Sequence, residues 1–267
     1  MIHEKIFLRE GEEDITLTTY IADERRALRD AILVIPGGGY TQVCADREGE
    51  PIALAFMARG LNAFVLHYGV KEKARYPRAL ADASLAMQYI REHAEEYGID
   101  PERVFVCGFS AGAHLSASLG TRWHTKEVNE ALDIPFGINR PTGMLLCYPV
   151  LCYFPETHQG TFTNAFGTDT PTEEQIDFCS LDRGLSKETV PPAFFWQTSD
   201  DPAVNVKNTL RMTTALSEAG VPFEVHIYPH GPHGMALATE ATAPKPMWKN
   251  ERIAGWVDLA YSWLKTI

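Results

Sequence analysis

Residues 103–115 read RVFVCGFSAGAHL, and this stretch decides the fold class. The apolar run over residues 103–107 predicts a buried strand, and the small residues from Ala111 onward predict a helix. Between them lies a Gly-x-Ser-x-Gly motif, whose two glycines leave room for a sharp, strained turn that lifts the serine hydroxyl clear of the backbone. The motif therefore predicts Ser110 as a nucleophile. The alternative is a glycine-flanked serine at an ordinary strand-to-helix turn.

Similar apolar runs recur along the chain, and helical patterns separate several of them. Buried strands of about six residues are expected at 31–35, 62–67, 103–108, 143–148, 193–198 and 223–228. Helices are expected at 50–59, 77–97, 111–120, 206–219 and 251–264. More polar runs at 5–8 and 15–20 predict antiparallel edge strands. The alternation predicts an α/β fold with a mostly parallel sheet of about eight strands, helices on both faces, and active residues at the strands' C-terminal ends.

Two segments fall outside this alternation. Residues 121–140 and 151–192 are irregular, and the second is rich in Thr, Pro, Gly and aromatic residues. A structureless loop of that length is unusual, so we expect small elements folded over the site that shape substrate choice. The pattern shows no repeat and no large cap domain. The 267 residues, 45% of them hydrophobic, are expected to form one domain over 1–267.

Charge and cysteine content exclude several classes of function. A formal net charge of −11 argues against nucleic acid or an anionic membrane as a partner, because both require clustered Lys and Arg. Five cysteines without CxxC spacing indicate reduced, mostly buried thiols rather than a disulfide framework. The chain starts without a secretory leader pattern and has no long apolar run, so a cytoplasmic location is expected. Whether the chain forms a homo-oligomer stays open.

A glycine run follows the first central strand, in Pro36-Gly37-Gly38-Gly39-Tyr40. Backbone N–H groups in such a run can approach a substrate carbonyl closely and stabilise a developing oxyanion. Gly38 and Gly39 are the candidate donors, beside the N–H of Ala111 directly after the nucleophile. The alternative is a flexible turn or a phosphate cradle. The run lacks the spacing of nucleotide-binding motifs, which makes that function the weaker choice.

A general base and a carboxylate are expected on later loops. Residues 229–234 follow the predicted last strand and contain His230 and His233. His233 is the preferred base and His230 the alternative. A zinc pair is disfavoured because no further ligand cluster completes it. The carboxylate that orients the imidazole is expected to be Asp201 or Asp200, with Asp182 a distant third. Along the chain the three residues then follow the order Ser, Asp, His, which is the order expected for a fold with a Gly-x-Ser-x-Gly turn at the nucleophile.

Five segments together resemble the bacterial carboxylesterase and acetyl esterase branch of the α/β-hydrolases, including acetyl xylan esterase-like enzymes. The matching segments are residues 35–40, 76–82, 107–115, 201–204 and 230–234. The resemblance implies the α/β-hydrolase fold, and it favours Asp201 over Asp200 and His233 over His230. One departure is Pro36 in place of the histidine that often opens the glycine run, which removes a side chain that braces this loop in the wider family.

The resemblance implies a serine carboxylesterase that needs no cofactor and no metal. It would remove short O-acyl groups, acetyl first, from esters of carbohydrates or similar alcohols through a Ser-His-Asp triad and an acyl-enzyme. Tyr40 and Phe109 are predicted to bind substrate, because aromatic faces suit sugar rings and acyl chains alike. Two alternatives stay open: a serine peptidase related to the prolyl and acylaminoacyl oligopeptidases, and a catalytically inactive hydrolase fold that serves as a binding module.

Overall fold

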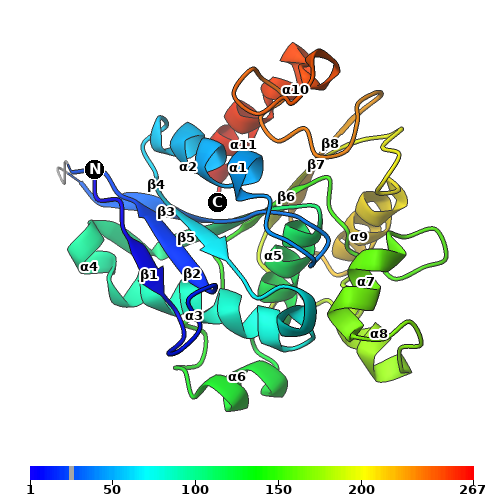
Figure 1. Cartoon of the computed structure of the whole chain (residues 1–267), viewed down its shortest axis with the longest axis horizontal. Helices are drawn as coiled ribbons and strands as arrows, with labels where there is room; N and C mark the ends of the chain where they lie inside the picture. The colour runs from blue at the N-terminus through cyan, green and yellow to red at the C-terminus, as the bar shows by residue number, and fades with distance from the viewer. Residues whose placement is uncertain (24–26) are drawn as a thin grey trace.

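The computed structural model describes residues 1–23 and 27–267, and its strands form one twisted sheet through the middle of the molecule (Figure 1). Within these residues the strand order is β1-β2-β4-β3-β5-β6-β7-β8. The strands are β1 Lys5–Phe7, β2 Thr16–Tyr20, β3 Arg29–Ile35, β4 Asn62–His67, β5 Ile99–Phe109, β6 Met144–Cys147, β7 Ala193–Thr198 and β8 Phe223–Tyr228. Strands β3 to β8 run parallel, whereas β1 and β2 pair antiparallel. The predicted α/β class and mostly parallel sheet are confirmed.

Helices cover both faces of the sheet (Figure 1). They are α1 Ala45–Glu48, α2 Glu50–Met57, α3 Arg78–Glu92, α4 Ala94–Tyr97, α5 Ala111–Arg122, α6 Lys126–Leu132, α7 Gln159–Phe166, α8 Glu173–Cys179, α9 Lys207–Glu218, α10 Glu251–Ala254 and α11 Trp256–Leu264, with 3₁₀ turns η1 Lys71–Ala74 and η2 Pro246–Trp248. Side chains of α3, α5 and α9 pack in one core cluster, and those of α2 and α11 pack in the other.

The central strands contain continuous apolar runs where both of their faces are covered. In β3, Leu33 and Ile35 point into the cluster with α3 and α5, while Ile32 and Val34 point into the cluster with α2 and α11. All four side chains are fully buried. This is why the strands read as continuous apolar runs in the sequence rather than as alternating ones.

Some element boundaries differ from the sequence prediction. The expected helix 77–97 is two helices, α3 and α4, separated at His93, and the expected helix 251–264 divides into α10 and α11 at Gly255. Strand β5 starts at Ile99, before the polar residues that hid its beginning, because Arg29 of β3 pairs with Ile99. The two irregular segments contain short helices, as expected: α6 in the first, and α7 and α8 in the second.

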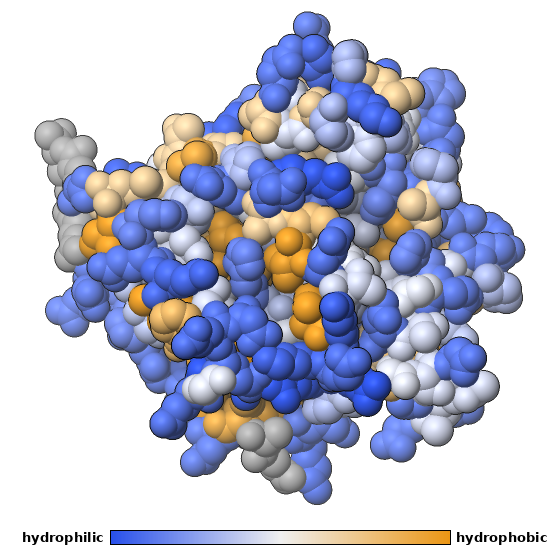
Figure 2. All heavy atoms as spheres, in the orientation of Figure 1, coloured by the Kyte–Doolittle hydropathy of each residue, from blue (hydrophilic) through white to orange (hydrophobic). Residues whose placement is uncertain are grey.

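The outer surface is mainly polar on the face in view. Figure 2 shows hydrophilic residues over most of that face, with apolar ones gathered in small areas. Apolar groups of this extent are usual on the surface of a folded domain. Among the described helices, none has the length and apolar character needed to cross a membrane.

The topology brings four loops to one edge of the sheet. Strands β3 and β5 are parallel neighbours, and Ile35 pairs with Gly108, so the glycine run after β3 lies beside the turn after β5. Strands β7 and β8 are also neighbours, and the loops after them contain the predicted carboxylate and histidine. Because the C-terminal ends of parallel strands meet at the same edge, every predicted site segment converges there.

Candidate active site

Ser110 lies in a strained turn between β5 and α5. Its backbone has φ 53° and ψ −115°, a conformation that non-glycine residues rarely adopt. The flanking glycines permit the turn, since a Cβ on Gly108 would lie 2.4 Å from the carbonyl oxygen of Gly112, and one on Gly112 would lie 2.2 Å from that of Ile35. The predicted elbow is therefore present, with the strand before it and the helix after it.

The structure brings Ser110, His233 and Asp201 into one hydrogen-bonded chain. The Nε2 atom of His233 lies 2.8 Å from Ser110 Oγ, and its Nδ1 lies 2.7 Å from Asp201 Oδ2. A carboxylate only accepts, so Nδ1 carries the proton and Nε2 is free to accept the serine proton. The side chain of Asp201 is buried, and its Oδ1 accepts the N–H groups of Ala203 and Val204, which fixes the carboxylate in place.

The alternative residues left open by the sequence have other partners. His230 is exposed and pairs with Asp200 at 2.8 Å, and Asp200 also accepts the N–H of Gly231. Asp200 thus fastens the start of the histidine loop, and the hydrogen bond to His230 lowers its pKa. Asp182 pairs with Arg211 and Ser180. Each of these groups hydrogen-bonds away from Ser110.

The glycine run borders the same cavity as Ser110. Gly38 and Gly39 both line it, and Ala111 begins the helix directly after the serine. The carbonyl of Gly38 accepts the N–H groups of Thr41 and Gln42, and that of Gly39 accepts the side chain of Asn164. These bonds hold the loop in a fixed conformation beside the serine. The N–H groups of Gly38, Gly39 and Ala111 stay the predicted oxyanion donors.

Glu48 is a buried carboxylate at the site, and no sequence pattern indicated it. One of its oxygens accepts the N–H of Gly37 at 2.8 Å, and the other accepts the hydroxyl of Tyr148 at 2.8 Å. Tyr148 in turn accepts the N–H of Ala236, and its ring meets that of His233 edge-on, with centroids 5.0 Å apart. Burial raises the pKa of Glu48, although Arg47 and these hydrogen bonds oppose that effect. Glu48 therefore links the glycine loop to the histidine loop.

This network braces the glycine loop from within the core. Glu48 closes α1, in a polar stretch that reads as ordinary surface, so no local signal marked it as buried. A charged residue is rarely fully buried unless it is paired. Its 1% exposure arises only from the way α1 packs under the glycine loop.

Two expectations need correction, because Tyr40 and Phe109 do not face the cavity. Phe109 is fully buried and contacts the rings of Tyr148 and Trp256. Tyr40 is 2% exposed, and its hydroxyl lies 2.8 Å from His114 Nδ1. Both side chains point into the core: Phe109, the last residue of β5, packs in the cluster with α2 and α11, and Tyr40 packs in the cluster with α3 and α5. They pack in the core next to the site rather than line the cavity.

The cavity at the site has a volume of about 370 Å³ and is lined mainly by glycines and by residues with polar side chains. Besides the glycines, Ser110 and His233, side chains with polar atoms line it: Thr41, Gln42, Arg47, His158 and Asn164. Of the described residues around it, none is a large apolar side chain. Asn164 and Gly160 belong to α7, so the second irregular segment contributes one wall. Among the described residues, no cluster of three or more His, Cys, Asp or Glu could hold a metal ion.

Comparison with known proteins agrees with this geometry. The family model BD-FAE matches residues 17–140. The crystal structure of an acetyl ester-xyloside bifunctional hydrolase from Caldicellulosiruptor lactoaceticus superposes with a TM-score of 0.85 and 34% identity, covering 98% of this chain and 96% of that one. The chain belongs to the α/β-hydrolase esterase family. The predicted family resemblance is thus confirmed.

Two curated relatives of this chain are longer proteins. Endo-1,4-beta-xylanase B of Butyrivibrio fibrisolvens is 36% identical over 90% of this chain, and acetylxylan esterase of Xylanibacter ruminicola is 28% identical over 78% of it. The aligned part spans 36% and 42% of the length of those two proteins. The likeness therefore concerns one part of each relative.

Proposed function

We propose that the protein removes short O-acyl groups, acetyl first, from carbohydrate or similar alcohol esters, with Ser110 as nucleophile, His233 as general base and Asp201 as the orienting acid. The observation that carries this proposal is the chain of hydrogen bonds from Ser110 through His233 to Asp201, which borders a cavity lined by glycines and polar side chains. The names of relatives that act on acetyl esters and xylan support the substrate class.

In the first half of the proposed reaction, His233 takes the hydroxyl proton of Ser110 as Oγ attacks the ester carbonyl. The oxyanion that forms accepts N–H groups from Ala111 and from Gly38 or Gly39. His233 then returns the proton to the leaving alcohol, which leaves an acyl group on Ser110. In the second half, His233 deprotonates a water molecule that attacks the acyl group, and the carboxylic acid departs as Ser110 recovers its proton.

The side chains at the cavity support a small acyl group and a hydroxyl-rich alcohol. A long acyl chain gains affinity from large apolar side chains, at about 0.8 kcal/mol for each buried CH₂ group. None of the described residues that line the cavity has a large apolar side chain, whereas Gln42, Arg47 and Asn164 offer hydrogen bonds to alcohol hydroxyls. Binding energy is therefore available for the alcohol rather than for chain length.

The proposal is tested with Ser110→Ala, assayed against 4-nitrophenyl acetate and against acetylated xylo-oligosaccharides. Loss of the nucleophile should reduce kcat by at least about 10⁴-fold. The wild-type enzyme should favour acetyl over octanoyl esters in kcat/KM. Ser116→Ala is a matched control on the same helix, because it removes a buried hydroxyl that has no hydrogen-bond partner among the described residues and leaves the site intact.

Wild-type turnover in Ser110→Ala would overturn the proposal. Faster turnover of blocked peptides than of acetyl esters would point to a peptidase instead. Failure of the wild-type protein to react with a fluorophosphonate probe would point to an inactive binding module, since such probes label only an activated serine.

A further inference from the structure

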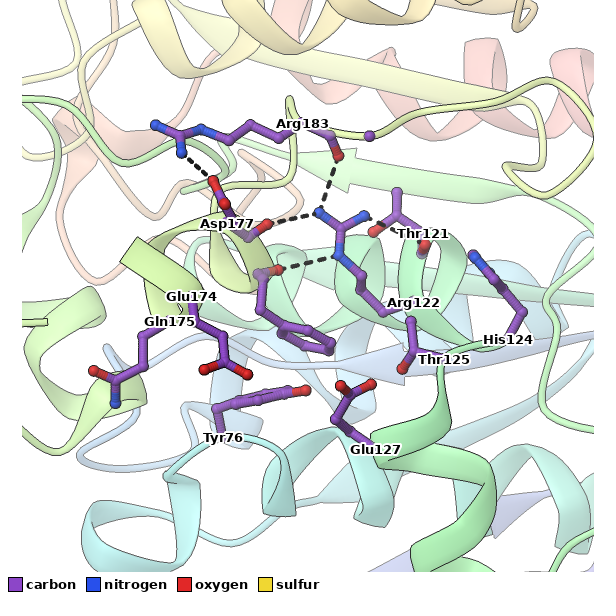
Figure 3. Close-up of a pocket in the computed structure, with 12 residues that line it drawn as sticks. Tyr76, Thr121, Arg122, His124, Thr125, Glu127, Glu174, Gln175, Asp177 and Arg183 are labelled. Atoms are coloured by element: carbon purple, nitrogen blue, oxygen red, sulfur yellow. Dashed lines mark hydrogen bonds and ion pairs between the residues drawn. The ribbon is translucent and has the colours of Figure 1, made fainter. Parts of the chain in front are cut away.

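Figure 3 shows a second cavity, which has a volume of about 770 Å³ and is larger than the one at Ser110. Among the described residues, the two cavities share no lining side chain. The walls of the second come from Tyr76 before α3, the C-terminal end of α5, the start of α6, and α8. Helices α6 and α8 belong to the two segments outside the regular strand and helix alternation. Much of the wall of this cavity therefore comes from those two segments.

An aromatic pair forms the floor of the cavity and is held firmly. The rings of Tyr76 and Phe178 lie against each other in a tilted arrangement, with centroids 3.6 Å apart and planes inclined by 38°. The guanidinium of Arg122 lies 5.6 Å from the Phe178 ring centroid. Arg122 is 7% exposed and donates to the backbone carbonyls of Phe178, Asp177 and Arg183. These bonds fix the C-terminal end of α8 and, with it, the Phe178 side of the cavity.

The cavity also contains buried polar atoms that lack a partner. The hydroxyl oxygen of Tyr76 is shielded from solvent and makes no hydrogen bond with the described residues, and the same holds for Oγ1 of Thr125. Buried polar atoms nearly always have a partner, and each exception needs an explanation. An atom that solvent does not touch becomes available only when neighbouring side chains move, so a ligand with hydroxyl groups that displaces them would supply the missing hydrogen bonds.

Two carboxylates also line the cavity. Glu127 from α6 and Glu174 from α8 direct their side chains toward Tyr76 (Figure 3). Burial, reinforced by the negative charge of both carboxylates, raises the pKa of Tyr76, so its hydroxyl keeps its proton. Carboxylates can only accept hydrogen bonds, whereas the tyrosine hydroxyl can donate one. A matching ligand therefore has groups that both donate and accept, together with an apolar flank.

We propose that this cavity binds a ring of a neutral saccharide at a site separate from the ester-cleaving centre. The sugar hydroxyls donate to Glu127 and Glu174 and accept from Tyr76, while the C–H groups of the ring pack against the Tyr76 and Phe178 pair. An organic cation would satisfy the carboxylates but would leave the donor of Tyr76 without an acceptor. The inference goes beyond the proposed ester hydrolysis, because binding here needs none of the residues around Ser110.

Calorimetric titration of the full chain with xylotetraose, which has no ester to cleave, tests the proposal. Tyr76→Phe removes only the hydroxyl, and Glu174→Gln removes one negative charge at the rim. Each should raise Kd by about five- to tenfold, as expected when a hydrogen bond to the ligand is lost or loses its charge. Glu173→Gln is the matched control, since Glu173 is the neighbour of Glu174 on α8 but does not line the cavity. Its Kd should stay within about twofold of wild type.

Turnover of 4-nitrophenyl acetate should be unchanged in all three variants, which separates this test from that of Ser110. Equal Kd values in the wild type, Tyr76→Phe and Glu174→Gln would overturn the proposal, because the sugar would then bind elsewhere. Failure of xylotetraose, cellotetraose and maltotetraose to bind would also overturn it. Binding of spermidine, weakened by Glu174→Gln and without any saccharide binding, would assign the cavity to organic cations instead.

Discussion

Two histidines hydrogen-bond to Ser110, and their surroundings differ in charge and in access. On the outer side, His233 contacts Ser110 Oγ, has a carboxylate behind it and leaves 21% of its side chain exposed at the cavity. On the inner side, the backbone N–H of His114 donates to the carbonyl of Ser110 one helical turn away, and the residue is 3% exposed. The hydroxyl of Tyr40 and the carbonyl of Cys179 are the ring partners of His114.

The hydrogen-bond partners of an imidazole, rather than the residue type, decide what it can do. A carboxylate stabilises the imidazolium that forms when a histidine takes a proton. A carbonyl only accepts, so Nε2 of His114 carries the proton, and Nδ1 accepts the hydroxyl of Tyr40. Burial lowers the pKa of His114 to about 4, which keeps it neutral at ordinary pH. His233 is thus arranged to exchange protons, and His114 to hold the loop that follows the glycine run.

The largest expected effect comes from removing the charge behind His233. In Asp201→Asn the imidazole loses its acceptor at Nδ1 and can adopt the wrong tautomer, so kcat should fall by about 10³- to 10⁴-fold. Asp200→Asn is the neighbouring control: Asp200 contacts His230 and Gly231 rather than His233, and kcat should change by less than about threefold. Steady-state kinetics on an aryl acetate measure both. An equal loss in the two variants would mean that Asp201 has no special role.

A smaller effect is expected at the brace between the two loops. Glu48→Gln keeps the shape of the side chain but offers a single acceptor oxygen, so Gly37 and Tyr148 can no longer both donate to it. We expect kcat to fall by about ten- to a hundredfold, with KM changed little, because the loop is displaced from the geometry that the transition state needs.

Glu50→Gln, two residues further on the exposed surface, is the control for this variant. A purely structural role for Glu48 would instead lower thermal stability and leave kcat of the folded fraction unchanged. Measuring the active-site concentration with a fluorophosphonate titration distinguishes the two, since it counts competent enzyme independently of its rate.

These regions also differ in how well the sequence predicted them. The turn at Ser110 and the loop of His233 follow from local rules, because glycine spacing and the order of strands are visible in the residues themselves. Glu48 could not be found in this way, since its burial depends on how α1 packs against residues far along the chain. The predictions that Tyr40 and Phe109 bind substrate were wrong because an aromatic residue beside a predicted site can face either the cleft or the core. Only the packing of the folded chain decides between the two.

The smallest effect on turnover, and the most direct test of the comparison, is expected from His114→Gln studied as a function of pH. A histidine in the unfolded chain has its ordinary pKa of 6.5, whereas that of the folded His114 is about 4. Its stabilising contribution is therefore complete above pH 6.5 and is lost as pH falls toward 4, because the unfolded state binds the proton first. The loss is on the order of 3 kcal/mol in the free energy of unfolding.

Urea unfolding followed by tryptophan fluorescence, at pH 7, 6 and 5, measures this loss. Glutamine does not titrate, so the free energy of unfolding should fall less steeply with acidification in His114→Gln than in the wild type. The exposed His3→Gln variant should follow the wild-type slope. Parallel slopes for His114→Gln and the wild type would show that His114 takes up its proton in the folded state as readily as in the unfolded one, and the distinction between the inner and outer histidines would then fail.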